Sequence, residues 1–483
     1  MPKVLGPTLP WFDNWMRDTG QTVPDFDAMP SMPDLPPLLR FADGRAVAGP
    51  ADWPARRAEI LDQLCHWLFG TLPATPPALI GSKVVHEERE PGLVRQKVLL
   101  SFDTSPRVDI DIEIARPDGD GPYPVFLTQT THHAWMNLGA SRGYLSVMYP
   151  AADEDDQSRK FIDIYPECDW MTIARRAWLA GRALDYVLSL PEADASHVGI
   201  TGHSRNGKQS LIATAIEPRI TAVVSSSSGS SGAVPYRFAS ETSMQESVEF
   251  MTRQIPDWFH PRTRLFTGRE DKLPMDIHGL IALCAPRPCL LSDAFNDGCG
   301  NPFGGERAYL AAKQVYELLG APDALRVRWR HGNHETCAED VQSYFDFYDH
   351  AAGREQLYFA FDWHRWHARA KPVPAPPVAD ASRAGRLARV RWGLGDPPPQ
   401  AAEWGVSYGG EKSHDAMMIG RGHVPEGVRK TSFNFGDYIC GDLYHPAELD
   451  GSPLPVVIWL HSYNYGSGYT GAYMVGPRVY HHL

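Results

Sequence analysis

Apolar residues along the chain follow two alternating spacings, and this alternation predicts the fold. Apolar residues at positions 173, 177, 180, 184 and 187 repeat close to every 3.6 residues, which predicts a helix over 171–188. A second helix is predicted over 57–69. Strands are predicted at 94–101, 108–115 and 125–127. Strand–helix alternation from 125 to 350 predicts an α/β fold with a mostly parallel, doubly wound sheet.

The stretch 198–208 places a serine in a sharp turn between a strand and a helix. An apolar strand ends at Gly202, Ser204 follows after one residue, and a helical pattern continues beyond it. This order is typical of a nucleophile elbow, where a strained turn lifts the serine hydroxyl above the sheet. The second glycine, Gly207, comes three residues after the serine, and Asn206 stands where the general pattern has glycine. A Gly-rich turn with an incidental serine is the alternative interpretation.

A serine needs a histidine base and an acid that orients the base. In α/β-hydrolases the acid and the histidine follow the serine, on loops after later strands. The predicted strand 287–291 leads into a polar loop with two carboxylates, Asp293 and Asp297. The carboxyl ends of parallel strands meet at one edge of the sheet, so we expect this loop to face Ser204.

Two histidines follow the next predicted strand, 325–329. They are His331 and His334 in the segment His-Gly-Asn-His. His334 is the preferred base, and His331 is the reserve because it lies so close to the strand that capping would explain it. Each histidine alone favours a surface role, but the order serine, acid, histidine favours a catalytic triad.

The segment 202–208, Gly-His-Ser-Arg-Asn-Gly-Lys, resembles the G-C-S-R-x-G-K elbow of the glucuronoyl esterases and their bacterial, acetyl-xylan-esterase-like relatives. The resemblance covers roughly residues 35–350. Further motifs follow the same order: Trp178 with 182–186, Ser228-Gly229 with Gly232, 257–259, 273–278, 280–283 and 285–288. It implies an α/β-hydrolase fold, with Ser204 as nucleophile and His334 as base. It also implies that Arg205 is an oxyanion-hole residue and that Lys208 contacts sugar hydroxyls.

The chain departs from this family at several positions. His203 replaces the elbow cysteine that is disulfide-bonded in fungal members, so that bridge cannot form. Ser227 stands where the fungal acid would fall, whereas the bacterial position after the later strand falls near Asp297. Gly298 replaces a tryptophan that often follows that acid. The resemblance therefore implies the chemistry more firmly than the substrate.

These departures make Asp297 the predicted triad acid. Ser227 has no carboxylate, which leaves the loop after 287–291, and Asp297 precedes a flexible glycine suited to presenting a side chain. Asp293 lies only two residues past the predicted strand, where it would satisfy loop N–H groups. We therefore predict Asp297 in preference to the other nearby carboxylates, Glu241, Asp293 and Asp340.

The loop after strand 125–127 offers a second oxyanion donor. Thr130-Thr131-His132-His133 occupies the place from which α/β-hydrolases supply a backbone N–H, so Thr131 and His132 are predicted at the substrate site. The paired histidines lack a spaced third ligand, so no metal is predicted. The acidic run 153–156 is interpreted as a solvated loop, with cation binding as the alternative.

Composition narrows the classes of partner. The 483 residues are 43% hydrophobic and 22% charged, which are globular values. A net charge of −12 argues against nucleic acid and anionic membranes as partners. No signal peptide is evident, and seven thinly spread cysteines fit a reducing compartment, so a cytoplasmic location is expected. No cofactor is implied, and the expected partner is a small-molecule or glycan ester.

Proline content and strand patterns divide the chain into four segments. We predict an irregular N-terminal segment over 1–55, an α/β-hydrolase catalytic domain over 56–355, and a helix with a Pro-rich linker over 356–400. Residues 401–483 then repeat the strand, turn and buried strand that open the first domain, with strands predicted at 437–446 and 455–461. This segment is interpreted as an incomplete second hydrolase-like unit, and a lone hairpin is the alternative.

The predicted function is ester hydrolysis through an acyl-enzyme on Ser204, on a carbohydrate-linked glucuronoyl or acetyl ester. Two alternatives share the fold. One is an amidase or peptidase of the prolyl-oligopeptidase type, which the lack of a propeller-like repeat disfavours. The other is a non-catalytic carbohydrate-binding protein, which the joint presence of Ser204, Asp297 and His334 disfavours.

Overall fold

A computed structural model describes residues 9–239, 245–330, 332–354, 382–394, 407–408, 427–435 and 439–448. The chain divides into two units, Met1–Pro372 and Val373–Leu483. Within the described ranges, no helix combines the length and apolar character needed to cross a bilayer.

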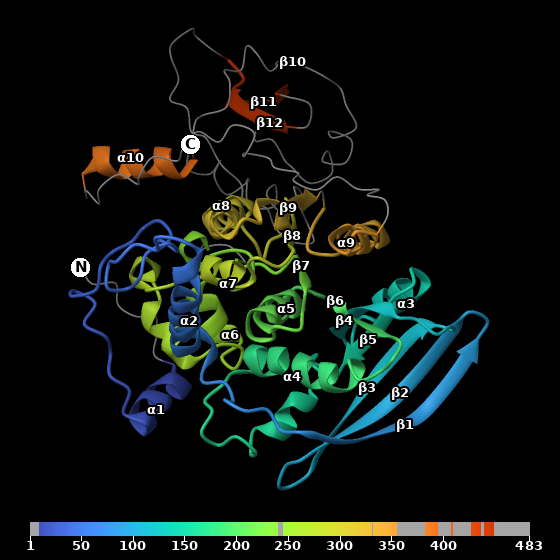
Figure 1. The fold of residues 1–483 in the computed structure, drawn as a ribbon. Helices are drawn as coiled ribbons and strands as arrows, with labels where there is room; N and C mark the ends of the chain where they lie inside the picture. Colours follow the sequence, from blue (N-terminus) through green and yellow to red (C-terminus); the bar gives the residue numbers. More distant parts are fainter. Residues whose placement is uncertain are drawn as a thin grey trace. The chain divides into compact units, whose positions relative to one another are not determined.

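A nine-stranded sheet forms the centre of the first unit (Figure 1). The spatial order is β1-β2-β3-β5-β4-β6-β7-β8-β9. The strands are β1 (Leu79–Glu90), β2 (Leu93–Phe102), β3 (Val108–Pro117), β4 (Tyr123–Gln129), β5 (Leu145–Tyr149), β6 (Ala193–His203), β7 (Ala222–Ser226), β8 (Cys289–Ala294) and β9 (Leu325–Arg330). The pairs from β5 to β9 are parallel, and those that join β1, β2, β3 and β5 are antiparallel. The predicted α/β-hydrolase arrangement of a mostly parallel sheet is confirmed.

Helices cover both faces of this sheet (Figure 1). In chain order they are α1 (Pro10–Thr19), α2 (Trp53–Leu64), α3 (His133–Ser141), α4 (Thr172–Val187), α5 (Arg205–Ile216), α6 (Val248–Gln254), α7 (His278–Leu283), α8 (Pro302–Leu318) and α9 (Ala338–Ala351). Residues of α2, α4, α5, α7 and α8 share one large apolar core with the strands, whereas α9 packs on the other face around Phe126 and Tyr144. Burial on both faces explains the short continuous apolar runs in inner strands, such as 125–127 in β4.

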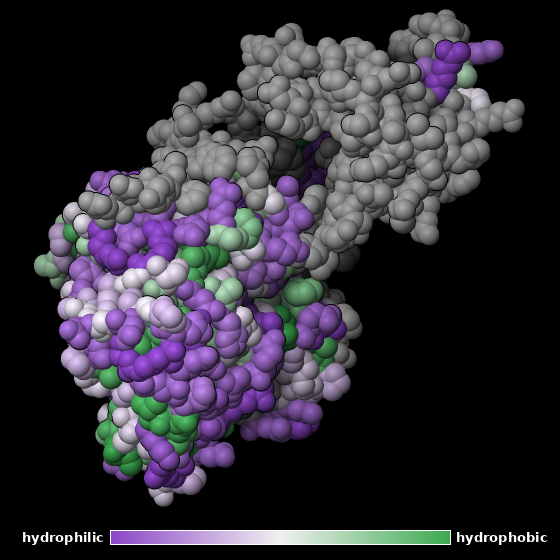
Figure 2. All heavy atoms as spheres, turned by 90° about the vertical axis from the view of Figure 1, so that its right-hand side faces the viewer, coloured by the Kyte–Doolittle hydropathy of each residue, from purple (hydrophilic) through white to green (hydrophobic). Residues whose placement is uncertain are grey.

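The strand β1 extends the sheet as an exposed edge. Almost all of its residues are exposed, including the apolar side chains of Ile80, Val84 and Val85. Figure 2 views the molecule from the right-hand side of Figure 1, and its coloured surface is largely hydrophilic with small separate hydrophobic patches. Scattered apolar side chains of this kind are normal on a protein surface.

The second unit contains α10 (Arg383–Leu394) and a small antiparallel sheet of β10 (Ser407–Tyr408), β11 (Val428–Phe435) and β12 (Ile439–Pro446). The strand β12 lies in the predicted strand 437–446. The next predicted strand, 455–461, and most of the predicted linker lie outside the described residues. The four-segment division of the chain therefore stays a prediction.

The parallel strands bring the predicted site residues to one edge of the sheet. His203 pairs in register with Ser226, and Ser226 pairs with Ser292. The loops that follow β6, β7, β8 and β9 consequently leave the sheet at the same edge. Ser204, Ser227, Asp297 and His334 lie on these four loops.

Candidate active site

Ser204 occupies a strained turn between β6 and α5. Its backbone has φ 60° and ψ −124°, a conformation that residues other than glycine rarely adopt. The Ser204 N–H donates to the carbonyl of Ser226 at 2.9 Å, which ties the turn to the neighbouring strand. The Ser204 carbonyl accepts from the N–H groups of Gly207 and Lys208, which starts α5. This geometry is that of a nucleophile elbow.

The spacing of the two glycines fits this turn. A Cβ on Gly202 would lie 2.3 Å from the amide oxygen of Gln129 and 2.6 Å from the Cβ of Asn206. A Cβ on Gly207 would lie 3.0 Å from the carbonyl oxygens of Gly202 and Ser226. The close approach of strand and helix therefore falls at Gly207, one residue later than in the general elbow pattern.

His334 and Asp297 form a hydrogen-bonded pair on the loops after β9 and β8. The Nδ1 of His334 lies 2.9 Å from Oδ2 of Asp297, whose side chain is only 2% exposed. The other oxygen, Oδ1, accepts from the backbone N–H of Cys299 at 2.9 Å. Both oxygens of Asp297 are thus fixed, and a carboxylate acceptor favours the tautomer of His334 that carries its proton on Nδ1. The reserve base His331 lies outside the described residues.

The other carboxylates weighed as triad acids are placed differently. Asp340 caps the start of α9, where its Oδ2 accepts from the backbone N–H of Cys337 at 3.0 Å. The same oxygen lies 3.6 Å from Nε of Arg330. Glu241 lies outside the described residues.

His203 joins the histidine loop to the elbow. Its ring centroid lies 4.6 Å from that of His334, so the residue before Ser204 packs directly on the predicted base. Burial, followed by the neighbouring His334, lowers the pKa of His203 to about 3. His203 is therefore neutral near pH 7 and adds no positive charge beside His334.

Arg330 contacts Ser227, the residue that the resemblance places where fungal members have an acid. Its Nη2 donates to Oγ of Ser227 at 2.9 Å and to the carbonyl of His334 at 3.2 Å. Ser227 has a positive φ of 43° and is fully buried. Arg330 therefore links Ser227 to the backbone of the loop that carries His334.

Asp293 is a second buried carboxyl near the pair. Neither of its oxygens has a well-formed hydrogen bond within the described part of the chain, although the Ser228 backbone N–H lies nearby. Burial, with a further contribution from the charge of Asp297, raises the pKa of Asp293 to about 7. The two carboxyls are thus distinct, because Asp297 is hydrogen-bonded and Asp293 retains its proton in slightly acid solution.

The raised pKa of Asp293 predicts a pH-dependent stability. The folded state holds this proton more tightly than the unfolded state, so its contribution to the free energy of unfolding falls as pH rises between about 4 and 7. We expect Asp293→Asn to raise the melting temperature at pH 8 and to change it less at pH 4.5. Thermal scans of both proteins at the two pH values test this, and an equal shift at both would contradict it.

The loop after β4 lies against the elbow helix. Oγ1 of Thr131 accepts a long hydrogen bond of 3.4 Å from the amide of Asn206. The ring of His132 is stacked on Trp135 at 4.3 Å, and its Nδ1 lies 2.8 Å from Oγ1 of Thr128. Burial lowers the pKa of His132 to about 4, so this ring is neutral near pH 7.

Lys208, which the resemblance implies contacts sugar hydroxyls, is buried. Its side chain is 1% exposed, and its Nζ donates to Oε2 of Glu246 at 2.6 Å. Glu246 is also buried, and burial raises its pKa while Lys208 opposes that rise. The position faces inward because Lys208 lies on the first turns of α5, whose residues from 206 to 215 are buried.

The acidic run 153–156 is exposed at Asp153 and Glu154, as expected of a solvated loop, but two of its carboxylates also form ion pairs with arginines that the sequence did not indicate. Asp153 pairs with Arg205 and Arg176, and Asp156 pairs with Arg176 and Arg175. Two of these arginines, Arg175 and Arg176, are buried on α4. The sequence of this acidic run does not indicate that arginines pair with it, because those arginines come from other segments of the chain.

Three side chains at the site lie close enough to share a metal ion. Ligand atoms of Asp297, Cys299 and His334 lie within 4.8 Å of one another. The hydrogen bond between Asp297 and His334 accounts for two of the three, and burial raises the pKa of the Cys299 thiol to about 12. The thiol is therefore protonated near pH 7, a form that does not ligate metals.

Comparison with known proteins identifies relatives of this chain. A family model described as "Glucuronyl esterase, fungi" matches residues 102–320. A carbohydrate esterase from an unknown prokaryotic organism is 28% identical over 65% of this chain and 89% of its own. A 4-O-methyl-glucuronoyl methylesterase from Wolfiporia cocos is 30% identical over 63% of this chain and 76% of its own. The chain belongs to the glucuronoyl esterase family.

Solved structures of family members have the same fold. A promiscuous esterase of carbohydrate esterase family 15 from a marine bacterial metagenome aligns with a TM-score of 0.58 and 26% identity, over 68% of this chain and 99% of its own. A glucuronoyl esterase of that family from Caldicellulosiruptor kristjansonii aligns with a TM-score of 0.57 and 26% identity, over 70% and 97% of the two chains.

Membership of the glucuronoyl esterase family corrects one expectation. The expected cytoplasmic location is wrong, because the fungal glucuronoyl esterase relatives from Wolfiporia cocos, Podospora anserina and Schizophyllum commune are secreted, extracellular enzymes. The expectation rested on the first residues of the chain and on thinly spread cysteines, and neither observation establishes where a protein acts.

Sequence reasoning missed Glu246, Arg330 and the role of His203 as a packing partner of His334. For Glu246 a signal existed, because a lysine on the buried face of an apolar helix requires an acidic partner. For Arg330 and His203 the partners come from separate loops, and nothing in the local sequence identifies them.

Proposed function

We propose that this chain is a serine carboxylic ester hydrolase that cleaves glucuronoyl esters of carbohydrates through an acyl-enzyme. The observation that carries the proposal is the hydrogen bond between His334 and Asp297, on loops at the same sheet edge as the strained elbow serine. Family membership supports the ester chemistry and the class of substrate.

The proposed reaction has two halves. Nε2 of His334 takes the proton of Ser204, whose Oγ attacks the ester carbonyl and forms a tetrahedral intermediate. The protonated histidine then gives its proton to the departing alcohol, which leaves the uronoyl group esterified to Ser204. Water, deprotonated by the same histidine, attacks this ester and releases the uronic acid and the free serine.

We propose that the oxyanion is held at the start of α5. The first amides of a helix have no carbonyl partner within the helix, and its N-terminus carries a partial positive charge. The guanidinium of Arg205, the first residue of α5, adds a full charge. The second donor would be the backbone N–H of Thr131, because that of His132 donates to the carbonyl of Gln129 at 2.9 Å.

A substrate panel tests the proposal. The panel offers the possible ester and amide bonds at equal concentration. Its members are methyl glucuronate, acetylated xylan, simple p-nitrophenyl acyl esters and peptide anilides. We expect release of methanol from methyl glucuronate with the highest kcat/KM of the panel. Faster hydrolysis of the anilides would favour a peptidase, and no hydrolysis of any member would favour a non-catalytic binding protein.

Arg205→Ala is expected to lower kcat for methyl glucuronate about 10²-fold, as for the loss of one oxyanion donor. The KM should change much less, because the charge that Arg205 meets develops only in the transition state. Steady-state kinetics at several substrate concentrations separate the two parameters. A rise in KM at unchanged kcat would instead assign Arg205 to substrate binding.

We propose that the buried pair of Lys208 and Glu246 supports the sugar side of the site from within the protein. Lys208→Met should raise KM for methyl glucuronate more than for p-nitrophenyl acetate, which has no sugar. It should also lower the melting temperature, because it leaves the Glu246 carboxylate buried without its cation. Glu246→Gln in the same chain should restore much of that loss. An equal rise in KM for both esters would contradict a role of this pair on the sugar side of the site.

A further inference from the structure

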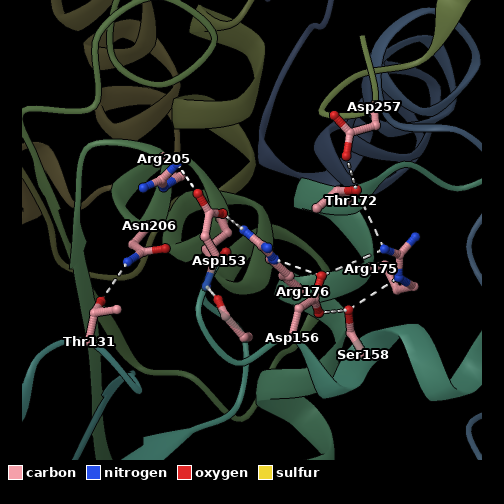
Figure 3. A network of polar contacts seen from close by, with 12 residues as sticks. Thr131, Asp153, Asp156, Ser158, Thr172, Arg175, Arg176, Arg205, Asn206 and Asp257 are labelled. Atoms are coloured by element: carbon pink, nitrogen blue, oxygen red, sulfur yellow. Dashed lines mark hydrogen bonds and ion pairs between the residues drawn. The ribbon is translucent and has the colours of Figure 1, made fainter. Parts of the chain in front are cut away.

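The side chain of Arg205 is restrained by two contacts. Its Nη1 forms an ion pair with Oδ2 of Asp153, and its Cζ lies 5.5 Å from the ring centroid of Trp258 (Figure 3 shows the ion pair). Among the described residues, Asp153 is the one polar partner found for this guanidinium. The side chain of Arg205 is still 36% exposed, so it is restrained without being buried.

Asp153 is itself fixed by a buried arginine. Oδ1 of Asp153 accepts from Nη1 of Arg176 at 2.8 Å, and Nε of Arg176 donates to Oδ2 of Asp156 at 3.0 Å. The side chain of Arg176 is only 3% exposed. Figure 3 shows this arginine between the two carboxylates. A buried cation with two acidic partners has little freedom to move, so it fixes the orientation of Asp153.

Helix α4 supports both restraints on Arg205. Arg176 lies on this helix. At the start of the same helix, the backbone N–H of Thr172 donates to the carbonyl of Asp257 at 3.1 Å. The next N–H, that of Ile173, donates to the carbonyl of Trp258 at 3.4 Å. The start of α4 thus fixes the backbone that carries the Trp258 ring. One buried helix therefore sets the position of both the carboxylate and the indole that contact Arg205.

We propose that Asp153 is a positioning residue, which holds the guanidinium of Arg205 where the oxyanion of the reaction forms. This inference rests on the proposed function. A guanidinium presents several N–H donors in a fixed planar fork, so Arg205 keeps donors for the substrate while one nitrogen pairs with Asp153. Arginine has a long, flexible side chain, and catalysis by a charge depends on that charge being in place before the reaction.

Asp153→Ala tests the proposal, with Glu154→Ala as the matched control. Glu154 is the next residue and is also an exposed carboxylate, so both variants change the loop charge equally. We expect Asp153→Ala to lower kcat for methyl glucuronate about 10-fold with KM within about 3-fold, and Glu154→Ala to change neither. Asp153→Asn retains an acceptor and should give an intermediate kcat. It also serves as the variant to measure if Asp153→Ala does not fold.

The double variant separates positioning from a structural effect. If Asp153 acts through Arg205, then Arg205→Ala with Asp153→Ala has the same kcat as Arg205→Ala alone. An equal loss in both backgrounds, or a kcat within twofold of the parent for Asp153→Ala, overturns the proposal. The esterase proposal fails on a different result, namely activity that survives Ser204→Ala, so the two failures are distinguishable.

Discussion

Ser204→Ala is expected to lower kcat by about 10³-fold or more and to abolish labelling by a fluorophosphonate probe. The reason is that Oγ of Ser204 forms the covalent bond in both halves of the proposed reaction. The strained backbone of Ser204, at φ 60°, presents this oxygen at the tip of the elbow. Labelling by the probe and hydrolysis of methyl glucuronate, measured on the same preparation, check the two consequences together.

Ser231→Ala is the matched control for this experiment. Ser231 is also a serine with positive φ, at 66°, but it is buried and its hydroxyl donates to the Tyr236 hydroxyl at 2.5 Å. Its variant should retain labelling by the probe. Esterase activity of Ser204→Ala close to that of the parent would end the acyl-enzyme mechanism.

The central fold could be predicted from the sequence because its signals are local. The helix over 171–188 matches α4, and the strands at 94–101 and 108–115 match β2 and β3, since apolar periodicity records burial. The edge strand β1 was not predicted. Its residues are exposed and largely polar, so they carry no apolar pattern, and its strand conformation comes from pairing with β2.

The charged contacts of the site could not be predicted in the same way. Lys208 meets Glu246 38 residues later in the chain, and the acidic loop at Asp153 meets an arginine from α4 and another from the elbow. Local sequence does not specify which charges the fold brings together. The order of serine, acid and histidine was informative because parallel strands impose a shared edge, which the register of β6 to β9 shows.

Asp297→Asn is expected to lower kcat about 10²- to 10⁴-fold and to leave the fold intact. The contacts of Asp297 give the reason. The backbone N–H of Cys299 now donates to Oδ1 of Asp297, and the side-chain oxygen of an asparagine would take over this hydrogen bond. The NH₂ group of the asparagine would then point toward Nδ1 of His334. Nδ1 would then have to accept, which moves the histidine proton to Nε2 and prevents Nε2 from taking the proton of Ser204.

Asp293→Asn is the matched control, because it makes the same chemical change four residues earlier, at the end of β8. Its carboxyl is already mostly protonated at slightly acid pH, so we expect kcat for methyl glucuronate to stay within a few-fold of the parent at pH 6. Melting temperatures and kcat for both variants decide the assignment. A large loss of kcat in Asp293→Asn together with a small loss in Asp297→Asn would assign the triad acid to Asp293. The reason is that only the carboxylate that orients His334 can control the tautomer of its ring.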